Sequence, residues 1–114
     1  MQLRDAQRAV KEFAERNGWE DKPNIDKFDH VHEELIEMSQ YLRYMDEDGR
    51  KMSVEKNRVV FEDGIGDLMF SVLRLANQLG IDVEKAFETS RAEVERKYSG
   101  TGKETNIVPE KGKR

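Results

Sequence analysis

The chain has 114 residues, of which 39% are charged and 36% hydrophobic, and its formal net charge is −4. A chain of this length supports one compact domain, and its acidic balance argues against a nucleic acid as partner. It contains no cysteine, which excludes disulfides, thiolate zinc sites and cysteine nucleophiles. Because no stretch reaches the ~20 apolar residues of a membrane span, we expect a cytoplasmic protein without membrane contacts.

The first helix is expected over residues 1–17, where apolar residues recur at spacings of three and four. Asn17 and Gly18 are typical of a helix C-terminus, and residues 19–23 form a connector. Asp26 is a candidate N-cap for a second helix that extends to Met45. The apolar residues of this helix form a heptad seam: Phe28, Val31, Leu35, Met38, Leu42 and Met45.

The charged stretch 46–51 interrupts the helical period and predicts an exposed loop. A third helix starts near Ser53 or Val59 and ends at Gly80. Its predicted core face consists of Phe61, Ile65, Leu68, Met69, Val72, Leu75, Ala76 and Leu79. The polar residues are confined to a narrow strip, made of Asp63, Asp67, Ser71, Arg74 and Gln78. So wide an apolar surface is typical of a helix at the centre of a bundle or of an oligomer interface.

A fourth helix follows Asp82 and continues to about Tyr98, with Phe87 and Val94 among its inward residues. Residues 99–114 lack periodicity and are expected to form a polar tail or arm. No segment shows the alternation of a β-strand. The sequence therefore predicts an all-α fold, in which residues 1–98 form a four-helix bundle-type domain that oligomerises through a shared helical core.

Acidic residues are placed at helical spacing on both of the middle helices. Glu34 and Glu37 are three residues apart and share one helix face, and Asp63 and Asp67 are four apart on the polar strip. Carboxylates this close to a packing face repel one another unless a cation lies between them, and Mg²⁺ prefers oxygen ligands. The alternative is that these acids belong to solvated helix faces, since the chain has 24 acidic residues.

Four segments resemble, in order and spacing, the MazG-like family of all-α nucleoside triphosphate pyrophosphohydrolases, which are relatives of the dimeric dUTPases. The segments are residues 10–19, 30–38 with the motif EExxE, 66–82, and 95–98. Two positions depart from the family pattern. Gly64 stands where the family motif ExxD has its glutamate, and Glu93 stands where the family tends to carry a phosphate-contacting lysine.

The resemblance implies hydrolysis of a nucleoside triphosphate to the monophosphate and pyrophosphate, with Mg²⁺, or Mn²⁺ in its place, as cofactor. The residues at the family's metal-binding positions are Glu34, Glu37 and Asp67, with Asp63 as a provisional fourth ligand. Glu33 is the candidate carboxylate that activates the water, and Lys97 and Arg91 are candidates for binding the substrate. A homodimer or a dimer of dimers is expected. The alternatives are a catalytically silent MazG-like oligomer or binding protein and, with less support, a plain helical adaptor.

Three residues near the acidic motif allow a functional and a structural interpretation. His30 and His32 suggest zinc, but residues two apart on a helix point to different faces, so we favour a structural or exposed role. Trp19 has the stacking surface for a base, but a single tryptophan in a small fold more often caps the core.

Five further residues also allow two interpretations. Tyr41 and Tyr44 follow the acidic face and suit either a nucleoside pocket or interface packing. Arg74 is expected to balance the charge of the acids on its strip, and it would contact phosphate only if a ligand entered from that side. Gly64 and Gly66 are expected to permit close helix contact rather than to bind phosphate.

Overall fold

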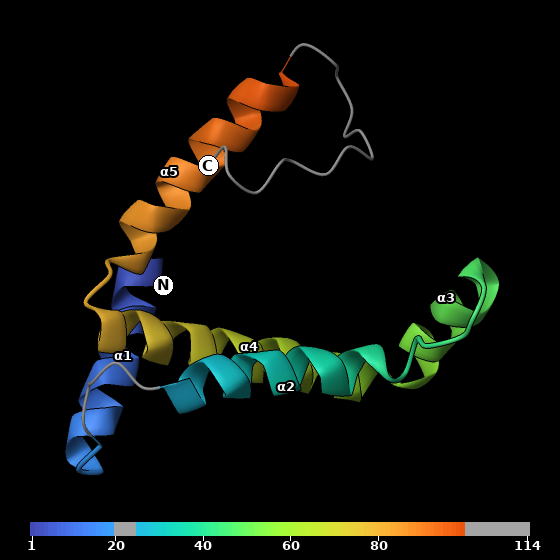
Figure 1. The fold of residues 1–114 in the computed structure, drawn as a ribbon, viewed down its shortest axis with the longest axis horizontal. Helices are drawn as coiled ribbons and strands as arrows, with labels where there is room; N and C mark the ends of the chain where they lie inside the picture. The colour runs from blue at the N-terminus through green and yellow to red at the C-terminus, as the bar shows by residue number, and fades with distance from the viewer. Residues whose placement is uncertain (20–24, 100–114) are drawn as a thin grey trace. The chain divides into compact units, whose positions relative to one another are not determined.

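The computed structural model describes residues 1–19 and 25–99, and all regular elements in that part of the chain are α-helices. They are α1 (Leu3–Arg16), α2 (Ile25–Ser39), α3 (Glu47–Lys56), α4 (Arg58–Leu79) and α5 (Val83–Tyr98), as Figure 1 shows. The all-α prediction is confirmed. The predicted connector beyond residue 19, and the predicted tail beyond residue 99, lie outside the described residues.

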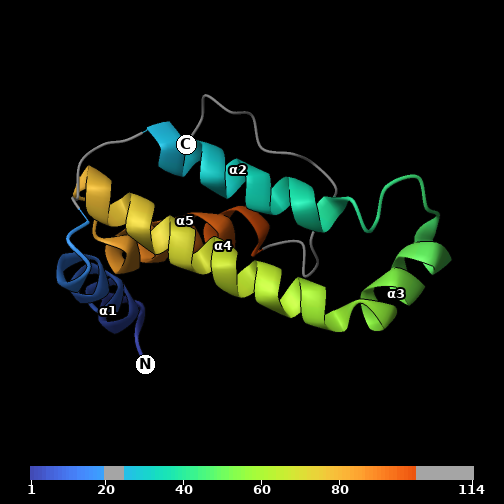
Figure 2. The ribbon, with the colours of Figure 1, turned by 90° about the horizontal axis from the view of Figure 1, so that it is seen from below.

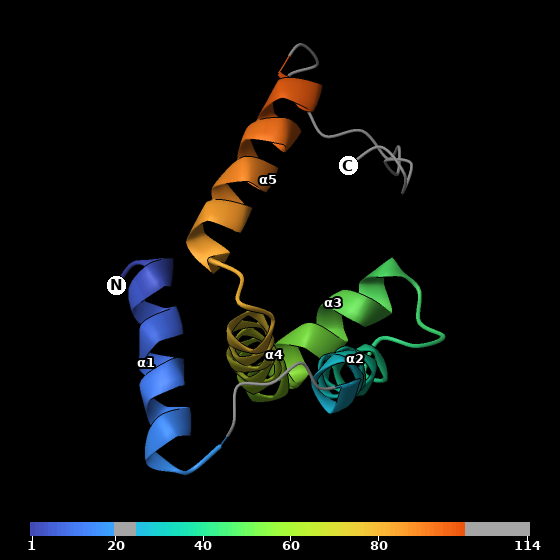
Figure 3. The same cartoon turned by 60° about the vertical axis from the view of Figure 1, so that its left-hand side comes forward.

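The chain divides into two compact units, Met1–Val83 and Glu84–Arg114. In the first unit α4 is the central helix, because α1, α2 and α3 all pack on it. Helix α2 runs antiparallel beside α4 (Figure 2), and α1 lies on another side of α4 (Figure 3). The four-helix bundle stays a prediction. Within the described ranges, no helix has the length and apolar character needed to cross a membrane.

Two helix ends lie where the sequence predicts them. Asn17 ends α1, where its side-chain Nδ2 donates to the carbonyl of Phe13 at 2.8 Å, and Gly18 follows with φ +71°. Gly80 ends α4 in the left-handed conformation, with φ +68°. Glycine adopts this backbone conformation without the Cβ clash that other residues meet, which is why the helix stops there.

Residues 46–51 are exposed as predicted, apart from the half-buried Gly49, but the prediction of a loop is wrong, because most of this stretch belongs to α3. The carboxylate of Asp46 accepts a hydrogen bond from the backbone N–H of Gly49 at 2.8 Å and so caps the helix. Glu47 and Asp48 in the first turn and Lys56 in the last have the charges that the helix dipole favours. The Asp46 cap and the end charges stabilise α3, although its sequence shows no helical period of apolar residues.

The predicted bounds of the second helix are also wrong at both ends. Helix α2 begins at Ile25, so Asp26 lies in its first turn rather than before it. It ends at Ser39 rather than at Met45. Residues 40–44 form turns that redirect the chain toward α3, and Tyr44 there has a positive φ of 63°.

Of the residues predicted to form the core face of α4, only Ala76 is buried in a single copy of the chain. The buried residues of α4 are Gly64, Ser71, Leu73, Arg74, Ala76 and Gln78, which include three members of the polar strip. Ile65, Met69 and Leu79, which were expected in the core, are each at least 40% exposed. Helix α4 packs on both α1 and α2, and Val10 and Ala14 on α1 and Met38 on α2 are buried as well.

Helix α5 belongs almost entirely to the second unit and buries none of its side chains. Phe87 and Val94, predicted to point inward, are both more than half exposed. Among the described residues of the whole chain no large side chain is fully buried. Among the described residues, more large hydrophobic side chains are exposed than buried.

Candidate functional site

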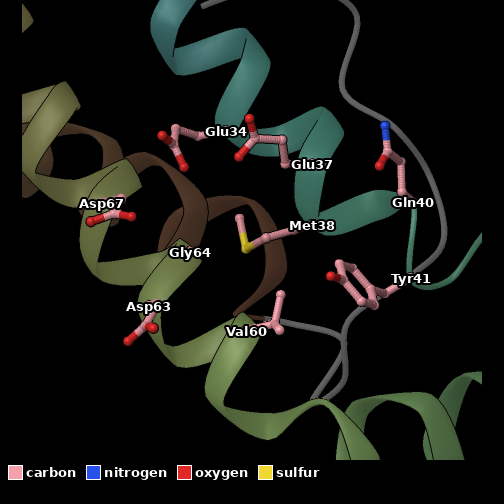
Figure 4. A pocket seen from close by; sticks show the side chains of 9 residues that line it. All are labelled: Glu34, Glu37, Met38, Gln40, Tyr41, Val60, Asp63, Gly64 and Asp67. Atoms are coloured by element: carbon pink, nitrogen blue, oxygen red, sulfur yellow. The ribbon is translucent and has the colours of Figure 1, made fainter.

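A cavity of about 380 Å³ lies between α2 and α4 (Figure 4). Its lining residues are Glu34, Glu37, Met38, Gln40, Tyr41, Val60, Asp63, Gly64 and Asp67. The four residues predicted as metal ligands all belong to this lining. They come together because each acidic pair occupies one face of its helix and the two helices run side by side.

The carboxylates enter the cavity from opposite walls. Glu34 and Glu37 project from α2 toward α4, and Asp67 lies across from Glu34 on α4 (Figure 4). The carboxylate of Asp63 lies one helical turn earlier on α4 and points away from the two glutamates. Glu34, Glu37 and Asp67 are therefore the acids best placed to share a ligand.

The donor set fits Mg²⁺ in kind, because carboxylate oxygens are the protein ligands that this ion prefers. In the described part of the chain, however, no three His, Asp or Glu side chains stand close enough together to form a finished metal cluster. Like charges on facing helices repel, which favours side-chain conformations that hold the carboxylates apart. Closing the cluster would require changes of side-chain rotamer and a cation to balance the charge.

Glu34 has a partner that sequence reasoning missed. Nε2 of His30 lies 3.3 Å from a carboxylate oxygen of Glu34, whose side chain is only 15% exposed. The signal was the spacing of four residues, which puts both side chains on one helix face. From the sequence, His30 was paired with His32 as a possible zinc ligand and not with Glu34. A ring nitrogen on one oxygen of a carboxylate restricts its orientation, so His30 positions Glu34 in the wall of the cavity.

Gly64 forms part of the α4 wall, where the side chain of Met38 reaches across from α2 (Figure 4). A Cβ atom at residue 64 would lie 2.5 Å from the sulfur of Met38 and 2.6 Å from its Cγ. The interpretation of Gly64 as a close-contact glycine is confirmed. Gly66 is different, because a Cβ atom there would meet nothing within 4 Å.

Three predicted site residues lie elsewhere. Glu33 is exposed on α2 and is not among the residues that line the cavity. Arg91 and Lys97 are exposed on α5, in the second unit, where Nη1 of Arg91 donates to Glu95 at 2.9 Å. Their roles in catalysis and substrate binding stay predictions.

Trp19 and Arg74 form a contact at the edge of the core. The ring of Trp19 packs edge-on against Phe13, with 5.4 Å between ring centroids. The guanidinium of Arg74 lies over the Trp19 ring, 5.2 Å from its centroid. Trp19 thus covers the core, as interpreted from the sequence. Arg74 lies about 10 Å further along α4 than Asp67, given a rise of ~1.5 Å per residue.

Comparison of the chain with protein-family models, curated proteins and solved structures gives no match. The likeness to the MazG-like family rests on the sequence motifs alone. Function is argued below from the cavity and its residues.

Proposed function

We propose that the chain is a Mg²⁺-dependent nucleoside triphosphate pyrophosphohydrolase of the MazG-like type, working in the reducing cytoplasm that a chain without cysteine suits. One observation carries the proposal. Glu34 and Glu37 on α2 and Asp67 on α4 line the same cavity, although they are about 30 residues apart in the sequence. An acidic cavity repels a polyphosphate unless cations enter with it, so this lining is suited to a metal–nucleotide complex.

The reaction needs little covalent chemistry from the protein. Water adds to the α-phosphorus, the bond from that phosphorus to the bridging oxygen breaks, and pyrophosphate leaves. Mg²⁺ held by Glu34, Glu37 and Asp67 would supply neutralisation of the phosphate charge. Glu33 is the proposed carboxylate that orients the water, and Arg91 and Lys97 are the proposed phosphate-binding cations.

The apolar surface of α4 supports a homodimer or a dimer of dimers. Ile65, Met69, Phe70 and Leu79 are each at least 40% exposed, although they belong to the most apolar helix of the chain. Large apolar side chains left exposed on one helix often mark an interface. We propose that a second copy of the chain packs on these residues, because the two copies together would complete a core that one copy leaves open.

A second candidate is a catalytically silent oligomer or binding protein of the same type. Gly64 is the observation that favours it. The family's acidic ligand is missing at this position, and the side chain of Met38 occupies the adjoining space. Glu93 adds a negative charge where the family tends to bind phosphate. Both features reduce the number of groups available for metal and substrate.

Pyrophosphate release separates the two candidates. The purified protein is incubated with a panel of standard and modified NTPs and dNTPs, with Mg²⁺, with Mn²⁺ and with EDTA. The enzyme proposal expects metal-dependent release that Glu37→Ala and Asp67→Ala abolish. Glu62→Gln is the matched control, since Glu62 is an exposed acid on α4 outside the cavity lining. Release from none of the substrates would leave the silent oligomer as the better description.

A further inference from the structure

Another, smaller cavity lies beside α1, with a volume of about 290 Å³. Its walls come from one face of α1, the last turn of α4 and the residue Asp82 beyond that helix. The lining residues are Arg4, Gln7, Arg8, Lys11, Asn77 and Asp82. Asn77 follows Asp67 by ten residues on α4, which is about 15 Å at the helical rise of ~1.5 Å per residue. This cavity is therefore separate from the acidic one between α2 and α4.

The lining of this cavity is cationic, although the chain as a whole is acidic. Arg4, Arg8 and Lys11 recur at spacings of four and three, which puts them on one face of α1. Among the described residues that line the cavity, Asp82 is the only acid, and its carboxylate lies 3.3 Å from Nη2 of Arg4. One end of the lining is thereby neutralised, whereas Arg8 and Lys11 place two positive charges at the other end.

Arg8 and Lys11 are only weakly engaged by the rest of the chain. Nη1 of Arg8 lies 3.8 Å from a carboxylate oxygen of Asp5, and both side chains of this pair are more than half exposed, so the pair contributes little. The other oxygen of Asp5 accepts a hydrogen bond from the backbone N–H of Gln2 at 3.2 Å. Lys11 has no ion-pair partner among the described residues. Both cations can therefore turn toward an anion without breaking a strong contact.

Hydrogen bonds of Gln7 fix the backbone on which these cations stand. Its Nε2 donates to the carbonyl of Ile81 at 2.7 Å, and its Oε1 accepts from the backbone N–H of Val83 at 3.0 Å. Nδ2 of Asn77 donates to the carbonyl of Gln7 at 3.3 Å. These bonds hold α1 against the end of α4 and the residues that follow it. A site that is preorganised in this way loses less entropy when a ligand binds.

We infer that this cavity binds a small phosphate monoester, with the phosphate held by Arg8 and Lys11. A guanidinium donates two parallel hydrogen bonds to phosphate oxygens, and a lysine ammonium adds a compact charge. A phosphate monoester has a charge of about −1.5 to −2 near neutral pH, which two cations balance, whereas a single carboxylate would balance one.

The remaining lining suits the rest of such a ligand. The carboxamide of Asn77 and the carboxylate of Asp82 offer acceptor oxygens for hydroxyl groups. The carboxylate of Asp82 also repels a longer polyanion that would extend toward Arg4. The ligand is therefore a hydroxyl-bearing monoester rather than a polyphosphate. The inference does not depend on the acidic cavity or on hydrolysis of nucleotides.

NMR titration of the ¹⁵N-labelled full chain in EDTA tests the site. Without metal ions the carboxylates between α2 and α4 repel phosphate, so binding there does not interfere. Glycerol 3-phosphate, inorganic phosphate and succinate are added at neutral pH and constant ionic strength. Glycerol 3-phosphate should give saturable shifts of amides in residues 4–11 and at Asn77, with the lowest dissociation constant of the three.

Variants assign the binding to the two cations. Lys11→Gln and Arg8→Gln should each weaken glycerol 3-phosphate binding about tenfold, as expected for loss of a hydrogen bond to a charged group. Lys51→Gln removes the same charge from the exposed surface of α3 and should leave the affinity unchanged. All three side chains are exposed, so thermal unfolding should show an intact fold in each variant.

Three results would overturn the site. They are the absence of saturable shifts with glycerol 3-phosphate, binding of inorganic phosphate or succinate at least as tightly, and an equal loss of affinity in Lys51→Gln and Lys11→Gln. The last result would mean that the net charge of the protein attracts the anion. The proposed function fails differently, by absence of pyrophosphate release from nucleoside triphosphates, and that failure would leave this site unaffected.

Discussion

The sulfur of Met38 lies 2.5 Å from the point where a Cβ atom of residue 64 would be, so α2 and α4 meet where glycine alone leaves room. The contact lies in the lining of the cavity, between Glu34 and Tyr41. It sets how closely the two helices approach and hence how far apart their carboxylates stand. Gly64 thus contributes a packing contact at this point of the cavity wall.

Gly64→Ala is predicted to destabilise the protein by about 1 kcal/mol. Overpacking against Met38 costs roughly 1–3 kcal/mol, which exceeds the ~1 kcal/mol that alanine gains over glycine in a helix. Urea unfolding measures the difference. Gly66→Ala is the matched control on the same helix, and it should be neutral or stabilising because its Cβ meets nothing within 4 Å. Equal destabilisation by both variants would contradict the role of the Met38 contact.

Asp67→Asn is predicted to weaken Mn²⁺ binding at least ~10-fold, as loss of a ligand should cost no less than loss of a supporting residue. In EDTA the same variant should be more stable by a few tenths of a kcal/mol, roughly the cost of one like-charge pair, because it removes a negative charge facing Glu34. Calorimetric Mn²⁺ titration and urea unfolding test the two effects. Glu62→Gln should leave Mn²⁺ binding unchanged. An unaltered Mn²⁺ affinity in Asp67→Asn would remove Asp67 from the site.

His30→Ala is predicted to lower Mn²⁺ affinity about 10-fold by freeing the carboxylate of Glu34 to rotate, since supporting residues typically contribute 10–100-fold. The fold should be unaffected, because the His30 side chain is about half exposed. His32→Ala is the control, with the same chemistry on another face of α2. If His32→Ala weakens Mn²⁺ binding as much as His30→Ala, the contact with Glu34 is not the cause. Calorimetric titration of both variants decides this.

The ends of α1 and α4 and the grouping of the acids followed from the sequence because they depend on local signals. The three-residue spacing of Glu34 and Glu37 puts them on one face whatever packs against it. Gly80 ends α4 because glycine adopts the left-handed backbone conformation without strain. Helix α3 was missed because its stability comes from the Asp46 cap and from the charges at its ends. Neither of these produces a helical period of apolar residues in the sequence.

The packed face of α4 could not be predicted, because tertiary contacts determine it. Arg74 is buried despite its charge, with its guanidinium over the ring of Trp19, which comes from a distant part of the chain. Ser71 and Gln78 are buried on the same strip, whereas Ile65 on the apolar face is exposed. Hydrophobicity along one helix does not show which face its neighbours cover.

The Trp19–Arg74 contact is predicted to contribute about 1 kcal/mol, in the range for a partly buried cation–π pair. A double-mutant cycle with Trp19→Leu and Arg74→Met isolates this energy from the other interactions of each residue. Each single variant should be less stable than the wild type, and the double variant less destabilised than their sum. Urea unfolding followed by circular dichroism measures all four proteins. Strict additivity would show that the two side chains do not stabilise each other.

Ile65→Glu is predicted to shift the protein from an oligomer to a monomer. Ile65 is 55% exposed in one copy and lies four residues from Met69 on the apolar surface of α4, so a second copy would bury it. A carboxylate buried there without a partner would cost several kcal/mol, enough to dissociate a dimer at micromolar concentration. Size-exclusion chromatography with light scattering over a concentration series gives the mass. Lys51→Glu, on the exposed surface of α3, should leave the mass unchanged. A wild-type mass of 13.3 kDa at every concentration would refute the shared core.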